Sequence, residues 1–167
     1  FESRIEEIAE MAHKAGALVY MDGANLNALI GIVRPGDLGV DIMHINTHKT
    51  FSTPHGGGGP GAGGIGVKKA LEEFLPVPRV VKDGKAYRTD YDKPHSIGKV
   101  KAFFGNTGVL TRAYAYLLMH SQKELGAIAE NAILNANYLK SRLQDVYPAR
   151  SEEYCMHECV LTPAFQI

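Results

Sequence analysis

Residues 40–66, "VDIMHINTHKTFSTPHGGGGPGAGGIG", join an apolar run to an unusually glycine-rich segment. The run at 40–46 is typical of a strand that is covered on both faces of a parallel sheet. It leads into Thr47, His48 and Lys49, and eight glycines fall within the seventeen residues after the lysine. Flexible linkers are rich in glycine, but they do not usually begin with His-Lys-Thr. We therefore interpret this segment as a functional loop that follows a strand.

The residues before this segment predict an α/β fold. Residues 2–15 place apolar side chains at helical spacing, and Gly16 provides a C-terminal stop. The apolar run "ALVYM" (17–21) predicts a second buried strand, which ends at Asp22. Helix, strand, crossover and strand follow one another as they do in α/β proteins. Because ligands bind beyond the carboxyl ends of parallel strands, Asp22 and Lys49 are candidate site residues.

The second half of the chain is expected to be irregular at first and then helical. "GGIGVKK" (63–69) predicts a strand and "ALEEFL" (70–75) a helical turn, whereas residues 76–100 are expected to be mostly loop. Helical periodicity returns at Thr107–His120 and Lys123–Val146, and the second helix is long enough to connect two domains. The chain lacks an initiator methionine and ends just after a strand-like start, so we expect a fragment of a longer protein.

Composition and charge exclude several classes of partner. The 167 residues are 45% hydrophobic, and 18 lysines and arginines balance 18 aspartates and glutamates. Zero net charge argues against nucleic acid or an anionic membrane as the main partner. No apolar run reaches the ~20 residues that span a bilayer, and no signal peptide begins the chain. Cys155 and Cys159 are too few for a disulfide scaffold, which favours a cytoplasmic protein.

Three kinds of site could use the glycines or the histidines near them. Residues 61–66 match the dinucleotide pattern G-x-G-x-x-G, but that pattern needs a strand before it and a helix opening within it. A P-loop would need Gly-Lys-Ser/Thr, whereas Val67 follows Gly66. A metal site would draw on side chains that lie close in sequence, namely Asp41, His44, His48 and His55. No His-Glu-x-x-His motif supports the metal site. His44 is better explained as a core histidine, or as one that supports a site residue without binding the ligand.

A Schiff-base lysine accounts for all of these features together. A free lysine has a pKa of ~10.4, so about one in 2,500 is unprotonated at neutral pH. As an aldimine with pyridoxal phosphate, the same lysine becomes a leaving group for an incoming amino acid. In this interpretation Lys49 binds the cofactor and Asp22 keeps its pyridine nitrogen protonated. Ala24 lies under the ring, and Thr47 and His48 donate to the phosphate. The alternative is that Asp22 and Lys49 are ordinary solvated surface charges.

Three segments carry a resemblance to a known family. They are "MDGANLNAL", "INTHKTFSTPHGGGGPGAGGIGV" and "FFGNTGVLTRAYAYLL". Together they resemble the pyridoxal-phosphate-dependent P-protein of the glycine cleavage system, glycine dehydrogenase (decarboxylating), and most closely subunit 2 of its two-subunit form. The similarity extends over essentially the whole chain, and its most specific part is the segment from Asn46 to Gly61.

The resemblance implies a fold and a reaction. The fold would be that of a fold-type I pyridoxal-phosphate-dependent transferase, with part of an aspartate aminotransferase-like large domain, a mostly parallel sheet and flanking helices. Glycine would be decarboxylated by this oxidoreductase, and its aminomethyl group would pass to the lipoyl arm of the H-protein. Lys49 would be the aldimine lysine and Asp22 the pyridine partner, with Ala24, Thr47 and His48 as cofactor contacts. Subunit 1 would complete a heterotetramer.

The resemblance also implies a division of the chain into domains. Residues 1–122 would form the second half of the cofactor-binding large domain, 123–147 a connecting helix, and 148–167 the start of a small C-terminal domain. The chain alone would then be inactive. Two alternatives are another fold-type I decarboxylase that acts on amino acids and a non-catalytic scaffold subunit of the same fold.

Overall fold

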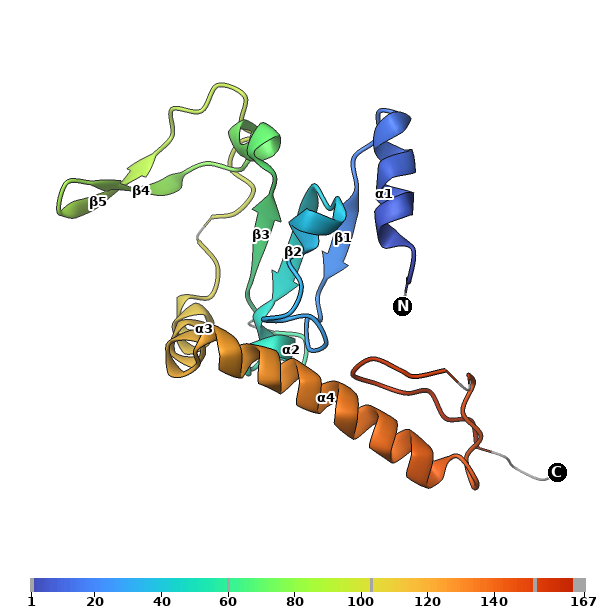
Figure 1. Ribbon diagram of the computed structural model, residues 1–167. Helices are drawn as coiled ribbons and strands as arrows, with labels where there is room; N and C mark the ends of the chain where they lie inside the picture. The colour runs from blue at the N-terminus through green and yellow to red at the C-terminus, as the bar shows by residue number, and fades with distance from the viewer. Residues whose placement is uncertain (1, 60, 103, 152, 164–167) are drawn as a thin grey trace.

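The protein has an α/β fold, as the sequence predicted (Figure 1). The computed structural model describes residues 2–59, 61–102, 104–151 and 153–163. Its elements in chain order are α1 (Ile5–Lys14), β1 (Tyr20–Gly23), the 3-10 helix η1 (Pro35–Leu38), β2 (Ile42–Asn46), α2 (Thr47–Thr50), β3 (Gly63–Val67), the 3-10 helix η2 (Lys69–Phe74), β4 (Arg79–Asp83), β5 (Ala86–Asp90), α3 (Thr107–Met119) and α4 (Gln122–Leu143).

The central sheet contains three described strands in the order β1-β2-β3. β1 and β2 are parallel, with Asp22 opposite His44. β3 runs antiparallel to β2, with Val67 opposite Ile42. The expected mostly parallel sheet is therefore found only in the first pair. A parallel return needs a crossover of a dozen or more residues, usually a helix, and the segment between Phe51 and Ala62 contains no described helix.

The carboxyl ends of β1 and β2 meet at one end of the sheet, where α2 begins (Figure 1). α3 and α4 lie at this end, and Phe51 after α2 meets Tyr116 of α3 edge to face at 6.3 Å. The loop after β1 reaches α4 through two glycines. A Cβ at Gly31 would overlap the backbone of Gly126, and Gly31 has a φ of +75°. This close approach places α4 beside the ends of the parallel strands.

The buried carboxylate of Asp41 joins several segments at the opposite end of the sheet. Asp41 precedes β2, and its side chain is only 9% exposed. It accepts a hydrogen bond from the Val19 amide at 2.8 Å and contacts His13 Nε2 at 2.7 Å and Lys68 Nζ at 3.3 Å. The Val19 amide, and after it His13, lower the pKa of the Asp41 carboxyl to about 2. Asp41 thus links α1 with all three strands.

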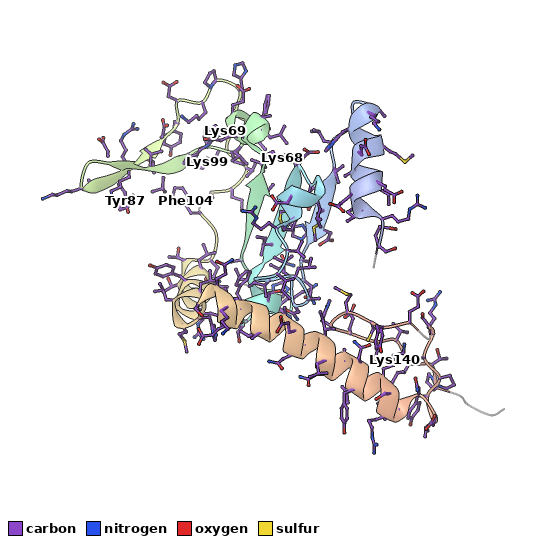
Figure 2. All side chains as sticks on the ribbon, viewed as in Figure 1. Lys68, Lys69, Tyr87, Lys99, Phe104 and Lys140 are labelled. Atoms are coloured by element: carbon purple, nitrogen blue, oxygen red, sulfur yellow. The ribbon has the colours of Figure 1, made fainter. Side chains whose placement is uncertain are left out.

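The prediction of a mostly looped segment at 76–100 is wrong for its middle. β4 and β5 form an antiparallel hairpin in which Asp83 pairs with Ala86 across the two-residue turn Gly84-Lys85. Gly84 has a φ of +61°, which glycine adopts at little cost. The Asp-Gly pair between short alternating runs is a hairpin signal. Tyr87 marks this hairpin, which projects on the side of the molecule away from Lys140 (Figure 2).

The two predicted C-terminal helices are confirmed as α3 and α4. α4 begins with a capping box, in which the Ser121 hydroxyl accepts from the Glu124 amide and the Glu124 carboxylate accepts from the Ser121 amide. After α4 the chain pairs with itself at Ala149 and Leu161. The expected small domain at 148–167 includes residues 152 and 164–167, which lie outside the described residues. Within the described part, no helix is both long and apolar enough to cross a membrane.

Candidate active site

Asp22 lies near the carboxyl end of β1 and presents its carboxylate at the surface. Its side chain is 74% exposed. Oδ1 accepts a hydrogen bond from the Ala24 amide at 3.0 Å and lies 3.3 Å from His44 Nε2 on β2. The backbone of Ala24 therefore holds the Asp22 carboxylate, and the small Ala24 side chain follows directly.

Two buried threonines anchor α2, the single helical turn that carries Lys49. The Thr47 hydroxyl donates to the Ala62 carbonyl at 2.9 Å and accepts from Thr53 at 2.9 Å. The Thr50 hydroxyl accepts from the Leu26 amide at 2.8 Å. The hydrogen bond between Leu26 and Thr50 ties the loop after β1 to α2, which follows β2. The two strand-end loops thus form one unit.

Lys49 is the exposed member of this anchored turn. Thr47 and Thr50 are three residues apart and face inward together, as positions i and i+3 of a helix do. Within the described part of the chain, the Lys49 amine makes no hydrogen bond and no ion pair. The site therefore offers a lysine with a fixed backbone and an uncommitted amine.

His48 supplies a polar atom that lacks a partner inside the protein. Its Nδ1 is buried and makes no hydrogen bond within the described part. The ring meets the edge of His55 at a centroid distance of 4.9 Å. His55 in turn accepts at Nδ1 from the Gly58 amide at 3.2 Å, which holds the start of the glycine tract. An unsatisfied buried imidazole nitrogen beside Lys49 is the kind of group that a ligand satisfies.

The donor set fits pyridoxal phosphate in most respects. Lys49 offers an amine for an aldehyde, Asp22 a carboxylate for a cationic ring nitrogen, and His48 a nitrogen for an anionic group. The Thr47 hydroxyl donates its single proton to Ala62 in this structure, so the expected contact of Thr47 with the phosphate stays a prediction. In this structure Thr47 positions the turn.

The other two chemistries weighed from the sequence have no support in the geometry. Residues 63–66 belong to strand β3, so the G-x-G-x-x-G pattern does not open a helix and the dinucleotide interpretation is excluded. Among the described residues, no group of three or more histidine, cysteine, aspartate or glutamate side chains is placed to hold a metal ion. His44 is engaged instead with Tyr20, whose hydroxyl lies 2.5 Å from Nδ1.

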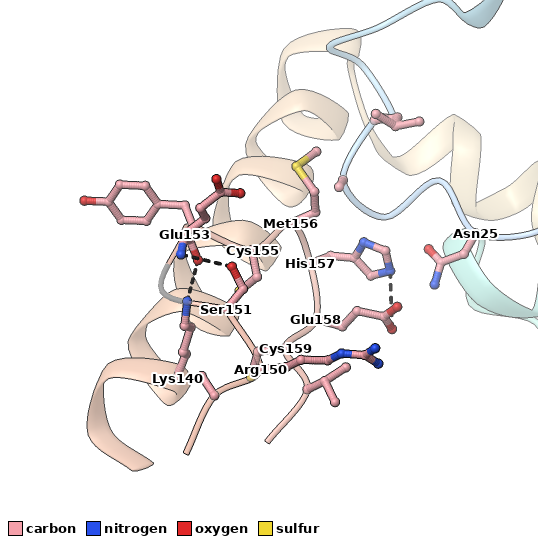
Figure 3. A pocket seen from close by; sticks show the side chains of 15 residues that line it. Asn25, Lys140, Arg150, Ser151, Glu153, Cys155, Met156, His157, Glu158 and Cys159 are labelled. Carbon is pink, nitrogen blue, oxygen red and sulfur yellow. Dashed lines mark hydrogen bonds and ion pairs between the residues drawn. The ribbon is translucent and has the colours of Figure 1, made fainter. Parts of the chain in front are cut away.

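The sequence did not predict a cavity of about 670 Å³ beside α4 (Figure 3). It lies between the loop after β1, at Asn25, and the segment after α4. Lys140 of α4 donates to the Glu153 carbonyl at its wall. Both ring nitrogens of His157 are buried without a hydrogen bond in the described part, and Glu158 Oε2 is 3.8 Å from Nε2. Because Asn25 follows Ala24, the cavity adjoins the end of β1.

Comparison with known proteins gives a consistent result at the level of sequence. The chain is 57% identical over 162 residues to a probable glycine dehydrogenase (decarboxylating) subunit 2 of Treponema denticola, covering 97% of this chain and 34% of that protein. A protein of the same name from Caldanaerobacter subterraneus subsp. tengcongensis is 56% identical, with 96% of this chain and 33% of that protein covered. No family model matches the chain.

The fold agrees with this result. The chain is similar to the crystal structure of glycine decarboxylase (P-protein) of the glycine cleavage system in inhibitor-bound form. The TM-score is 0.68 at 23% identity, and 90% of this chain and 37% of that chain are covered. The chain spans about a third of the length of the curated relatives it matches. The predicted resemblance is confirmed, and the chain is homologous over nearly its whole length to about one third of a glycine dehydrogenase (decarboxylating) subunit 2.

Proposed function

We propose that this chain supplies catalytic and cofactor-binding residues for the decarboxylation of glycine in the glycine cleavage system, with pyridoxal phosphate as cofactor. The names of the relatives and of the structural neighbour support this reaction. In this proposal the released aminomethyl group passes to the lipoyl arm of the H-protein. The surrounding fold is that of a fold-type I pyridoxal-phosphate enzyme.

One observation carries the proposal. Asp22 lies near the end of β1 and Lys49 lies in α2, directly after the parallel neighbour β2. The hydrogen bond from the Leu26 amide to the Thr50 hydroxyl joins the loop after β1 to α2. A free amine and an exposed carboxylate are thereby held at one end of the sheet. Ordinary surface charges would not need a turn with two buried threonine anchors beneath the lysine.

Each residue has a definite task toward the cofactor. Lys49 holds it covalently through the amine, and Asp22 keeps a proton on its ring nitrogen. Ala24 leaves room for a flat ring because its side chain is a single methyl group. His48 satisfies its buried Nδ1 on the anionic side, and Thr47 fixes the turn. Pyridoxal phosphate, when bound, accepts the electron pair that remains when the carboxylate of glycine leaves as CO2.

The wider assembly also belongs to the proposal. The relatives are named as a subunit 2, so we expect a partner subunit 1, and the arrangement we expect is a heterotetramer that accepts lipoylated H-protein in the cytoplasm. The division into residues 1–122, 123–147 and 148–167 stays a prediction. The start of α4 at Gln122 is compatible with a connecting helix from about 123.

The test uses the full-length protein together with its partner subunit. Lys49→Ala should abolish the visible absorbance of bound cofactor and the exchange of the glycine carboxyl with bicarbonate. Asp22→Asn should still bind cofactor, with lower affinity than the parent, but lose exchange by orders of magnitude, because the ring nitrogen loses its anionic partner. Lys69→Ala, at a lysine that is 91% exposed and pairs with Glu72, is the matched control and should behave as the parent.

Four outcomes would reject the proposal. The first is borohydride-reducible cofactor on a lysine other than Lys49, and the second is near-normal exchange in the Asp22→Asn protein. The third is a preference for another amino acid over glycine when a panel of amino acids is compared, which would favour a different decarboxylase. Cofactor binding without any turnover would indicate a scaffold subunit.

A further inference from the structure

A line of polar contacts runs across the sheet face that carries Asp22. Tyr20 and Asp22 are two residues apart on β1, so their side chains share a face. His44 of β2 lies opposite Asp22 in the parallel register. The Tyr20 hydroxyl is 2.5 Å from His44 Nδ1, and His44 Nε2 is 3.3 Å from Asp22 Oδ1. The Tyr20 and His44 rings are nearly parallel, with 17° between their planes.

These contacts decide where the imidazole proton lies. A carboxylate only accepts hydrogen bonds, so a neutral His44 must direct an N–H toward Asp22 through Nε2. Nδ1 is then an acceptor, and the Tyr20 hydroxyl has the proton that it needs. By donating to Nδ1, the Tyr20 hydroxyl stabilises the tautomer of His44 that carries its proton on Nε2, the nitrogen 3.3 Å from Asp22 Oδ1.

The same contacts fix the rotation of the Asp22 carboxylate. Oδ1 accepts from the Ala24 amide at 3.0 Å and faces His44. Within the described residues, Oδ2 makes no hydrogen bond or ion pair. A side chain that is 74% exposed would otherwise sample several rotamers and lose this freedom on binding a ligand. Two contacts on one oxygen leave the other presented to the site.

We propose that His44 is a positioning residue for Asp22 and that Tyr20 stabilises its tautomer with the proton on Nε2, so that Oδ2 meets a protonated aromatic ring nitrogen. This inference rests on the proposed function, which makes that nitrogen part of pyridoxal phosphate. His44 does not touch the cofactor itself. Its contact with Asp22 is long for a hydrogen bond, as contacts of catalytic groups often are before a ligand is present.

The experiment uses the full-length protein with pyridoxal phosphate labelled with nitrogen-15 in the ring. His44→Leu should weaken cofactor binding about tenfold or more, as expected for loss of a hydrogen bond to a charged group. It should also lower kcat with little change in the KM for glycine, and move the ring nitrogen signal toward the unprotonated position. His44→Gln should restore most of the cofactor affinity and of kcat, because the glutamine amide nitrogen can take the place of Nε2.

A second measurement on the cofactor-free protein tests the relay directly. Nitrogen-15 signals of the His44 ring should report a proton on Nε2, and Tyr20→Phe should weaken this tautomer preference while the fold is kept. Controls are His95→Leu, a histidine whose ring is 65% exposed, and Tyr87→Phe on the hairpin. Both should match the parent.

The outcomes separate this inference from the proposed function. If the parent binds the cofactor and Asp22→Asn loses the protonated ring signal, but His44→Leu keeps both that signal and the affinity of the parent, only the inference fails. A Tyr20→Phe protein with an unchanged His44 tautomer also overturns it. If the parent binds no pyridoxal phosphate through Lys49, the proposed function fails, and the ligand assigned to Oδ2 fails with it.

Discussion

Asp41→Asn should destabilise the protein by an amount that depends on pH. The native carboxyl has a pKa of about 2 against an ordinary value of 3.8, chiefly because the Val19 amide and then His13 stabilise its charged form. This difference corresponds to about 2 kcal/mol of stability at neutral pH. Since the native pKa is depressed, the contribution is complete above pH 3.8 and is lost as the pH falls toward 2.

The asparagine keeps the shape of the side chain and can still accept from Val19. It offers no negative charge to His13 and Lys68. We therefore expect the variant to be less stable than the parent by about 2 kcal/mol from pH 7 to pH 5. The gap should narrow to roughly half by about pH 3, because Asp41 of the unfolded parent is then mostly protonated while the folded parent still holds it charged.

The assay is urea denaturation of the full-length protein, followed by circular dichroism at pH 7, 5, 4 and 3. Asp37→Asn is a matched control, because Asp37 pairs with Arg34 at 2.7 Å but both side chains are largely exposed. It should change stability by less than about 0.5 kcal/mol. A parent-like Asp41→Asn protein at pH 7, or a gap that stays constant down to pH 3, would refute the account of Asp41 as the link between α1 and the sheet.

Gly31→Ala should cost at least about 2 kcal/mol in the same assay, because the new Cβ meets the backbone of Gly126 and the left-handed φ is strained for alanine; Gly36→Ala, with open space around it, should be nearly neutral. Ser121→Ala should cost about 1 kcal/mol by removing half of the capping box of α4, and an unchanged melting temperature would contradict that role. The isolated chain of residues 1–167 should self-associate in size-exclusion chromatography and show no glycine–bicarbonate exchange, because its sheet and α4 expose many large apolar side chains; a monomeric, active chain would contradict this.

Much of the fold follows from periodicity within short windows. The helices α1, α3 and α4 appear as predicted with small shifts at their ends, and the strands β1 and β2 lie within or next to the predicted runs. The β4–β5 hairpin was missed because its strands are polar and exposed, and only the Asp-Gly pair marks the turn. Strands with few buried side chains lack the apolar pattern from which a strand is predicted.

Some residues of the candidate site could also be predicted from the sequence, and others could not. Asp22 and Lys49 could be predicted because strand ends are visible in the sequence. The contact between Asp22 and His44 could not, because it depends on the register of two strands 22 residues apart. Thr47 looked like a phosphate donor beside Lys49, but its partner Ala62 is fifteen residues away. Long-range hydrogen bonds decide which polar side chains remain available.

The glycines after Lys49 act in part through the space that they leave. A Cβ at Gly63 would overlap the Ile45 carbonyl oxygen, so only glycine lets the start of β3 lie so close to the end of β2. That approach brings the Ala62 carbonyl within reach of Thr47. The carbonyl accepts hydrogen bonds from the Thr47 hydroxyl at 2.9 Å and from the Thr47 amide at 3.2 Å. Thr47 then holds the turn on which the Lys49 amine has no hydrogen bond or ion pair to any described residue. Lys49 therefore depends on the glycines because their close packing fixes the turn that carries it.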